Sequence, residues 1–193
     1  MDKSTRCFGN NDPLMAEYHD DEWGVPLHDD RELFSLIILE GAQAGLSWRT
    51  ILHRRDDYRE AFADFNPEIV ATYTDEKLEK LKLNSGIIRN KLKIASAVKN
   101  AKAFLAIQHE FGSFDKYLWA YVDYKPVMNS YSTWKDVPAE TALSTEISED
   151  LKNRGFSFIG PTIMYAYMQS VGMVNDHLTS CYRYNQILDE YER

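Results

Sequence analysis

The sequence predicts an all-α protein, and three observations carry this prediction. Alternation of apolar and polar residues, the pattern of a half-buried strand, is nearly absent along the 193 residues. Residues typical of helix starts, such as Ser47 and the Asn66-Pro67 pair, stand ahead of helical patterns. Apolar residues of segment 33–39 cover all sides of a helix, which is typical of a buried helix. The expected fold is many short helices with short connections.

Each helix is justified by its own start and stop signals. Asp29 or Asp30 can cap the helix that contains residues 33–39, and Ser47 can cap the one that begins at Trp48. Helices are expected over about residues 14–19, 33–39, 48–54, 56–62, 68–73, 75–83, 88–111, 113–122, 144–154 and 162–171. The prolines and the several Ser and Thr residues of segment 123–140 predict a loop. The polar tail after Tyr182 could fray.

One segment of this acidic chain is strongly basic. The net charge of −8 argues by itself against a nucleic-acid partner. Residues 80–109, however, contain no Asp or Glu, so this window carries +7 and the rest of the chain −15. Its basic residues are Lys80, Lys82, Arg89, Lys91, Lys93, Lys99 and Lys102. The window predicts a polyanion-binding face, and the alternative is an ordinary solvated helix surface.

The composition is that of an ordinary globular protein, with 44% hydrophobic and 27% charged residues. No apolar run reaches transmembrane length, and the polar N-terminus does not resemble a signal peptide. We therefore expect a cytoplasmic protein with no membrane partner. In the reducing cytosol Cys7 and Cys181 are candidates for metal ligands or free thiols rather than for a disulfide.

Two Cys/His pairs near the chain ends form a candidate metal site. His177 and Cys181 are four residues apart, so on a helical turn both side chains lie on one face and can share a metal. Cys7 and His19 form a second pair. Together they make a Cys2His2 set, which suits tetrahedral zinc, and a complete site with four protein ligands is structural. The alternative is a buried thiol and a hydrogen-bonded histidine.

Glu40 is the candidate recognition residue. It follows the apolar run, and a carboxylate removed from water must be protonated or hydrogen-bonded. The small residues of 41–45 and the helix starting at Trp48 come next, so the segment could form a pocket for a flat polar molecule. Tyr18 and Trp23 add aromatic rings that could stack a flipped-out purine. The alternatives are a structural ion pair for the acid and core packing for the rings.

Segment 81–93 reads as two helices joined by a tight turn. Gly86 breaks the first helix, and the second begins in the basic window with Arg89, Lys91 and Lys93. Backbone N–H groups at a helix start can hold a phosphate, which a glycine lets approach closely. Such a helix-hairpin-helix would bind the DNA backbone without reading sequence. A glycine between helices is weak evidence when it stands alone.

Five blocks of the sequence match one family in its order. They are YHDDEWGVP (18–26), LEGAQAGLSW (39–48), GIIR (86–89), RGFSFIG (154–160) and VNDH (174–177). Together they resemble the family of 3-methyladenine DNA glycosylase I, the Tag-type branch of the helix-hairpin-helix glycosylases. The match spans roughly residues 6–181. Agreement of five blocks is far more specific than any single motif.

The resemblance implies a two-lobed α-helical fold and excision of 3-methyladenine from alkylated double-stranded DNA, leaving an abasic site. It implies that Cys7, His19, His177 and Cys181 all bind one structural zinc, which completes the set that spacing only half suggests. It implies one glycosylase domain over 1–193, with the hairpin at about 75–110 and a zinc-stapled lobe from about 1–30 and 150–193. We expect a monomer.

The resemblance also assigns roles in the pocket and on the DNA side. Glu40, Tyr18 and Trp48 are expected to be the catalytic, base-binding residues, with Trp23 beside them. Gly45 and Leu46 would lie at the mouth facing DNA, and we expect Leu46 to fill the gap that the extruded nucleotide leaves.

Because 3-methyladenine in DNA is cationic, its bond is labile, and catalysis is expected to be mostly capture of the extruded base. Tag-type enzymes lack the Asp that related glycosylases use, which agrees with this. The chain departs from the family at Phe8-Gly9, since many members carry Trp at the position of Gly9. The rival interpretations are a non-catalytic zinc-stapled DNA-binding module, a helical scaffold, and a glycosylase that also accepts 3-methylguanine.

Overall fold

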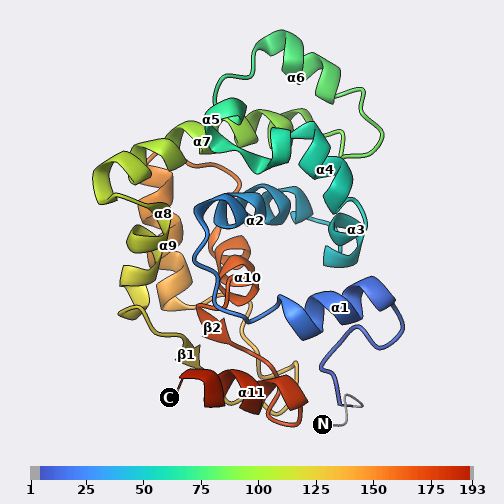
Figure 1. Ribbon diagram of the computed structural model, residues 1–193, viewed down its shortest axis with the longest axis vertical. Helices are drawn as coiled ribbons and strands as arrows, with labels where there is room; N and C mark the ends of the chain where they lie inside the picture. The colour runs from blue at the N-terminus through green and yellow to red at the C-terminus, as the bar shows by residue number, and fades with distance from the viewer. Residues whose placement is uncertain (1–4, 192–193) are drawn as a thin grey trace.

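The chain folds into mostly short helices around two central ones (Figure 1). The computed structural model describes residues 5–191 (Figure 1). Its elements are α1 (Pro13–Asp21), α2 (Asp30–Gln43), α3 (Trp48–Leu52), α4 (Arg55–Ala61), η1 (Ala63–Phe65), α5 (Pro67–Val70), α6 (Asp75–Leu81), α7 (Lys91–Phe111), α8 (Phe114–Trp119), η2 (Ala120–Val122), β1 (Val127–Met128), α9 (Ala142–Asn153), α10 (Pro161–Ser170), β2 (Val174–Asn175) and α11 (Tyr182–Tyr191). The prediction of a mostly helical protein is confirmed.

Helix α2 is the buried helix that the apolar run predicted. Leu33, Phe34 and Leu39 are almost completely buried, and Asp29 caps the helix by accepting the N–H of Glu32. In Figure 1, α2 and α10 lie in the middle, α4 to α7 lie at one end, and α1, the two strands and α11 lie at the other. The Tyr167 hydroxyl of α10 donates to the Leu33 carbonyl, so the two central helices are joined by a buried hydrogen bond.

Three local predictions are wrong. The long helix begins at Lys91 rather than near 88, because the side chain of Asn90 caps it by accepting the N–H groups of Leu92 and Lys93. The tail after Tyr182 forms α11 instead of fraying, since the fully buried Ile187 anchors it. The loop 123–140 contains β1, which pairs in parallel with β2 at Val127 and Val174. Pairing between distant segments leaves no local pattern to read.

The connection between α1 and α2 lies against the end of α10. The N–H of Gly24 donates to the Gln169 carbonyl, and that of Leu27 donates to the Val171 carbonyl. Gly172 follows, with φ +72°, and a Cβ there would lie 2.4 Å from backbone atoms of Val25 and Pro26. This close backbone approach sets α1 beside α10. Within residues 5–191 no helix is long and apolar enough to cross a membrane.

The contact at Gly172 predicts a large loss of stability on substitution. Gly172→Ala combines a left-handed backbone with a steric clash, so the free energy of unfolding should fall by about 2 kcal/mol or more. Gly160→Ala is the matched control, because a Cβ there meets nothing within 4 Å and φ is −58°. Urea unfolding of both variants would measure this, and equal effects would contradict the packing argument.

Candidate functional site

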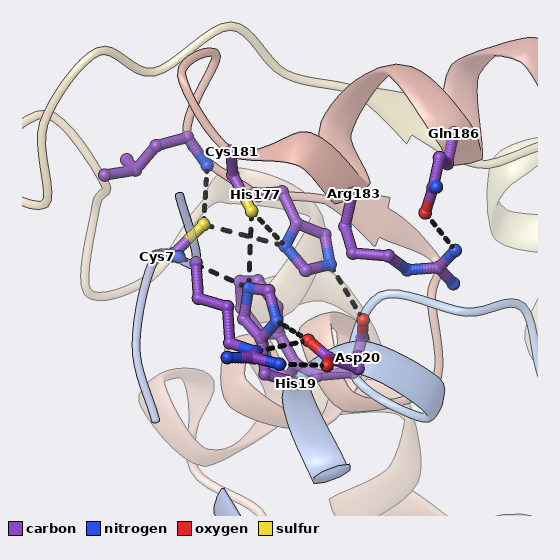
Figure 2. A network of polar contacts seen from close by, with 10 residues as sticks. Cys7, His19, Asp20, His177, Cys181, Arg183 and Gln186 are labelled. Carbon is purple, nitrogen blue, oxygen red and sulfur yellow. Dashed lines mark hydrogen bonds and ion pairs between the residues drawn. The ribbon is translucent and has the colours of Figure 1, made fainter. Parts of the chain in front are cut away.

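The two Cys/His pairs meet in one cluster. Cys7 precedes α1, His19 lies on α1, and His177 and Cys181 lie between β2 and α11. Their ligand atoms all lie within 4.8 Å of one another. Figure 2 shows the two sulfur atoms and two ring nitrogens pointing toward a common centre. The sequence therefore identified all four members of a cluster that could hold a metal ion.

Outer hydrogen bonds orient both imidazole rings of this cluster. Asp20 lies 2.9 Å from Nδ1 of His19, and the Trp23 carbonyl lies 2.9 Å from Nε2 of His177 (Figure 2). The opposite nitrogens, Nε2 of His19 and Nδ1 of His177, therefore face the sulfur atoms. Arg6 in turn binds both oxygens of Asp20, at 2.7 and 2.6 Å. Metal-ligating histidines commonly have such second partners.

The chemistry of the donor set fits a closed tetrahedral site. The contact between the two thiols, with His177 and His19 beside it, lowers the pKa of Cys181 and raises the pKa of Cys7, so one thiolate, the form that binds metals, is favoured at Cys181. The Leu178 N–H points at the sulfur of Cys7, at 3.2 Å. Two sulfurs and two ring nitrogens are available as donor atoms. Because His19, His177 and Cys181 are buried, water has little access to them.

A cavity of about 200 Å³ lies beside this cluster. Its walls come from α1, the end of α2, the start of α3 and α10, which the fold brings together from distant parts of the sequence. The lining residues are Phe8, Met15, Tyr18, Trp23, Glu40, Gln43, Trp48, Ala166, Gln169 and Ser170. All the predicted base-binding residues are among them.

Glu40 is buried in this cavity with only one oxygen paired. Its Oε1 accepts from the Ser170 hydroxyl at 2.5 Å, whereas Oε2 has no hydrogen-bond partner in the part of the chain that the structure describes. Burial raises the pKa of Glu40 to about 7, which the bond from Ser170 partly offsets. The carboxyl is therefore close to half ionised at neutral pH and presents a free oxygen to a ligand.

Ser170 is a site residue that sequence reasoning missed. Its hydroxyl accepts from the Tyr18 hydroxyl at 3.1 Å and lies 3.0 Å from the Ala166 carbonyl. It can donate to ionised Glu40, or accept from the protonated acid while donating to Ala166. Because Ser170 ends α10, 130 residues from Glu40, no sequence spacing signals this contact.

Aromatic rings form the rest of the wall. The rings of Tyr18 and Trp48 lie 5.2 Å apart, and Trp48 carries a buried indole N–H without a partner in the described residues. Phe8 packs edge-on against Trp23 at 5.2 Å and lies 6.4 Å from Tyr18. Phe8 thus fills the side of the cavity near Gly9, where the chain departs from the family pattern.

A second cavity, of about 180 Å³, adjoins the first. It shares Glu40, Gln43 and Ala166 with the first and is lined by Gly45 and Leu46 at its outer end. Gly45 has φ +80°, which allows the tight turn after α2, and Leu46 is 41% exposed. The turn of Gly45 and Leu46 therefore borders the cavity that adjoins the one of Glu40.

The basic window divides into paired and unpaired cations. Lys80 pairs with Glu76 at 2.7 Å, and Lys82 pairs with Glu79. Lys93 donates to main-chain carbonyls at the end of α2, so it is not a freely exposed cation as the sequence suggested. The cations of the window that are exposed and have no hydrogen-bond or ion-pair partner among residues 5–191 are Arg89, Lys91, Lys99 and Lys102.

The hairpin at Gly86 is held by Arg54, which immediately precedes α4, and by Tyr58 of α4. Arg54 donates to the carbonyls of Ser85 and Gly86 at 2.8 and 3.0 Å, and the Tyr58 hydroxyl accepts the Ile88 N–H at 3.1 Å. A Cβ at Gly86 would lie 2.7 Å from the carboxyl carbon of Asp57. The small size of Gly86 thus serves packing against α4, where the sequence suggested space for a phosphate.

Comparison with solved structures defines the class. A crystal structure of 3-methyladenine DNA glycosylase I matches with a TM-score of 0.90 and 44% identity, over 92% of this chain and 98% of that chain. A Tyr-to-Phe variant of 3-methyladenine DNA glycosylase I, in complex with 3-methyladenine, matches with a TM-score of 0.89 and 38% identity, over 94% and 97%. The fold is that of helical DNA glycosylases.

Sequence comparison defines the family. The methyladenine glycosylase family model matches residues 8–184. The DNA-3-methyladenine glycosylase of Haemophilus influenzae is 45% identical over 179 residues, which cover 92% of this chain and 97% of that protein. The chain therefore belongs to the methyladenine glycosylase family. This is a family of DNA-3-methyladenine glycosylases, which are N-glycosidases and hence hydrolases. The resemblance and the enzyme class predicted from the sequence are confirmed.

Burial of Glu40 predicts a specific pH dependence of stability. Because its pKa rises from 4.5 to about 7 on folding, its contribution is fully present below pH 4.5 and is lost as the pH rises through 7. Glu40→Gln cannot ionise, so between pH 5 and pH 8 its stability should rise relative to the natural protein by about 2.5 kcal/mol. Urea unfolding at both pH values tests this.

Exposed Glu60 provides the control for that measurement. Glu60→Gln removes an exposed carboxyl that has no hydrogen-bond or ion-pair partner within residues 5–191, and it controls for the loss of one surface charge. A difference between Glu40→Gln and the natural protein that stays constant from pH 5 to pH 8 would contradict the raised pKa.

Proposed function

We propose that this enzyme extrudes 3-methyladenine from alkylated double-stranded DNA into the cavity of Glu40 and hydrolyses its glycosidic bond, leaving an abasic site. The observation that carries the proposal is the unpartnered Oε2 of Glu40, buried in a cavity with aromatic walls. A buried acceptor without a partner costs free energy, so the site is complete only when a ligand donates to it.

Adenine chemistry suits this site. Its exocyclic amino group can donate to Oε2, and the adjacent ring nitrogen can accept from Glu40 when the carboxyl is protonated. The ring stacks against Trp48 and Tyr18, which lie on the same cavity. Burial, and then the charge of Glu40, raise the pKa of Tyr18 well above its usual value, so Tyr18 stays neutral. In this proposal Glu40, Tyr18 and Trp48 select the base, and Trp23 and Phe8 close the wall.

The reaction needs little acid–base assistance. The methylated base carries a positive charge in DNA, so it leaves without prior protonation. Glu40 is the only carboxylate that lines the cavity among residues 5–191, and no aspartate lines it. Catalysis is then mostly capture: the base is held out of the helix, negative charge of the DNA phosphates stabilises the oxocarbenium-like transition state, and water attacks C1′.

DNA would lie across the opening of the cavity. Arg89 and Lys91, exposed beside Gly86, would neutralise phosphates on one side. Leu46, exposed on the turn after α2, would enter the gap left by the extruded nucleotide, and Gly45 gives that turn its shape. Insertion of an apolar side chain into a base stack is a known way to hold a duplex open.

We also propose that the Cys2His2 cluster holds one structural zinc. Cys7, His19, His177 and Cys181 supply all four positions, so no open site remains for catalysis. The metal would tie the N-terminal segment to the C-terminal one, in a monomeric domain whose lobes follow the predicted boundaries. Residues 1–4 and 192–193 of those boundaries lie outside the described part of the chain.

The zinc proposal predicts one equivalent of metal per chain and a dependence on the second shell. Asp20→Asn retains the shape but weakens the orientation of His19, so zinc affinity should fall about 10- to 100-fold. Competition with a chelating dye measures this, and Asp21→Asn, an exposed neighbour, is the control. Equal zinc affinity in both variants, or a folded protein without bound metal, would argue against the proposal.

The function is tested by base release. Purified protein is incubated with methylated duplex DNA, and freed bases are identified by chromatography, with 3-methyladenine expected and 7-methylguanine absent. Release of 3-methylguanine as well would indicate a broader pocket. No release by folded, metal-loaded protein would contradict the proposal and favour a non-catalytic DNA-binding module.

Removal of the Glu40 carboxyl should reduce base affinity. Glu40→Ala deletes a hydrogen bond to a charged group, so affinity for free 3-methyladenine should fall about tenfold or more. Calorimetric titration measures it, with Glu60→Ala as the matched control. Unchanged affinity would remove Glu40 from the recognition of the base.

A further inference from the structure

Lys93 makes two internal hydrogen bonds in place of an exposed contact. Its Nζ donates to the Ala42 carbonyl at 2.8 Å and to the Ala44 carbonyl at 2.6 Å. These carbonyls belong to the end of α2, where the helix dipole places negative charge. The side chain is partly buried, and burial lowers the pKa of Lys93.

The turn that Lys93 contacts has little other support. Within it, the Leu46 N–H donates to the Gln43 carbonyl at 2.6 Å. Gly45 and Leu46 are exposed, and a Cβ at Gly45 would meet nothing within 4 Å. Among residues 5–191, Lys93 is the only side chain from another element that hydrogen-bonds to the backbone of residues 44–46.

The other end of Lys93 is anchored in the hairpin segment. Lys93 lies in the first turn of α7, and its N–H donates to the side chain of Asn90, which caps that helix. The residues just before Asn90 form the hairpin that Arg54 and Tyr58 hold. One side chain therefore spans from the hairpin to the turn of Leu46, and in Figure 1 both lie on the same side of the molecule, near α3 and α4.

We propose that Lys93 is a positioning residue that fixes the Leu46 turn relative to the hairpin, so that one docked DNA duplex meets both. The inference rests on the function proposed above and adds a residue whose role is alignment. A phosphate contact by Lys93 would require its ammonium to leave two carbonyls at the end of α2. The exposed Arg89 and Lys91 give up no such bonds on binding a phosphate, so they suit that role better.

The test separates alignment from charge. Lys93→Met preserves length and removes the two hydrogen bonds. We expect the single-turnover rate of base release from methylated duplex to fall about 10- to 100-fold, since a misplaced contact is costly. Affinity for free 3-methyladenine and the salt dependence of binding to undamaged duplex should match those of the natural protein. Leu46→Ala should show the same profile.

Two variants calibrate these readouts. Arg89→Met should reduce the slope of log affinity against log salt by about 1, as expected for a lost phosphate contact. Lys152→Met removes an exposed charge on α9, at the opposite side of the view, and should change none of the three readouts (Figure 1). A protein without activity in its natural form would contradict the proposed function instead of this inference.

Three results would overturn the role of Lys93. A salt slope lowered as in Arg89→Met would make it a phosphate contact. A loss of free-base affinity in step with the rate would show that it supports the Glu40 pocket and not the turn. An unchanged rate of base release would show that the turn keeps its place without it.

Discussion

Burial of the Glu40 carboxyl is the constraint on which the functional region depends. Removal of a carboxylate from water is costly, and the protein offsets this cost on one oxygen only, through Ser170. Tyr18 completes the chain by donating to Ser170. The second oxygen faces an aromatic cavity without a partner in the described structure. Ionisation of Glu40 thus lowers the stability of the protein at neutral pH, and a hydrogen bond from a base N–H group to the free oxygen would offset this loss.

The aromatic wall of the cavity depends on the ends of the chain. Tyr18 and Trp23 form, with Leu52, a small hydrophobic cluster separate from the main core. So small a cluster provides limited stabilisation by itself. The Cys/His cluster beside it joins the start of the chain to the segment before α11, and the Trp23 carbonyl and Asp20 orient its two histidines. The Cys/His cluster and the aromatic wall of the cavity therefore share the same short segments.

Charge counted along the sequence overstated the basic surface. Lys80 and Lys82 lie within a window without acids, yet they pair with Glu76 and Glu79 just outside it. The ammonium group of Lys93 donates hydrogen bonds to main-chain carbonyls at the end of α2. What remains are Arg89 and Lys91 beside the hairpin and Lys99 and Lys102 further along α7.

The sequence by itself determined the helical class, the buried helix of Leu33–Leu39, the cap at Ser47 and all four members of the Cys/His cluster. The first three follow from local periodicity and capping chemistry, and the Cys/His set from residue type and spacing together with the family resemblance. Only the tertiary structure decided that Glu40 pairs with Ser170, that Lys93 binds the end of α2, that β1 pairs with β2 and that the tail forms the helix α11. Each of these depends on a contact between residues at least 47 positions apart or on burial by distant elements, so no local pattern in the chain could specify it.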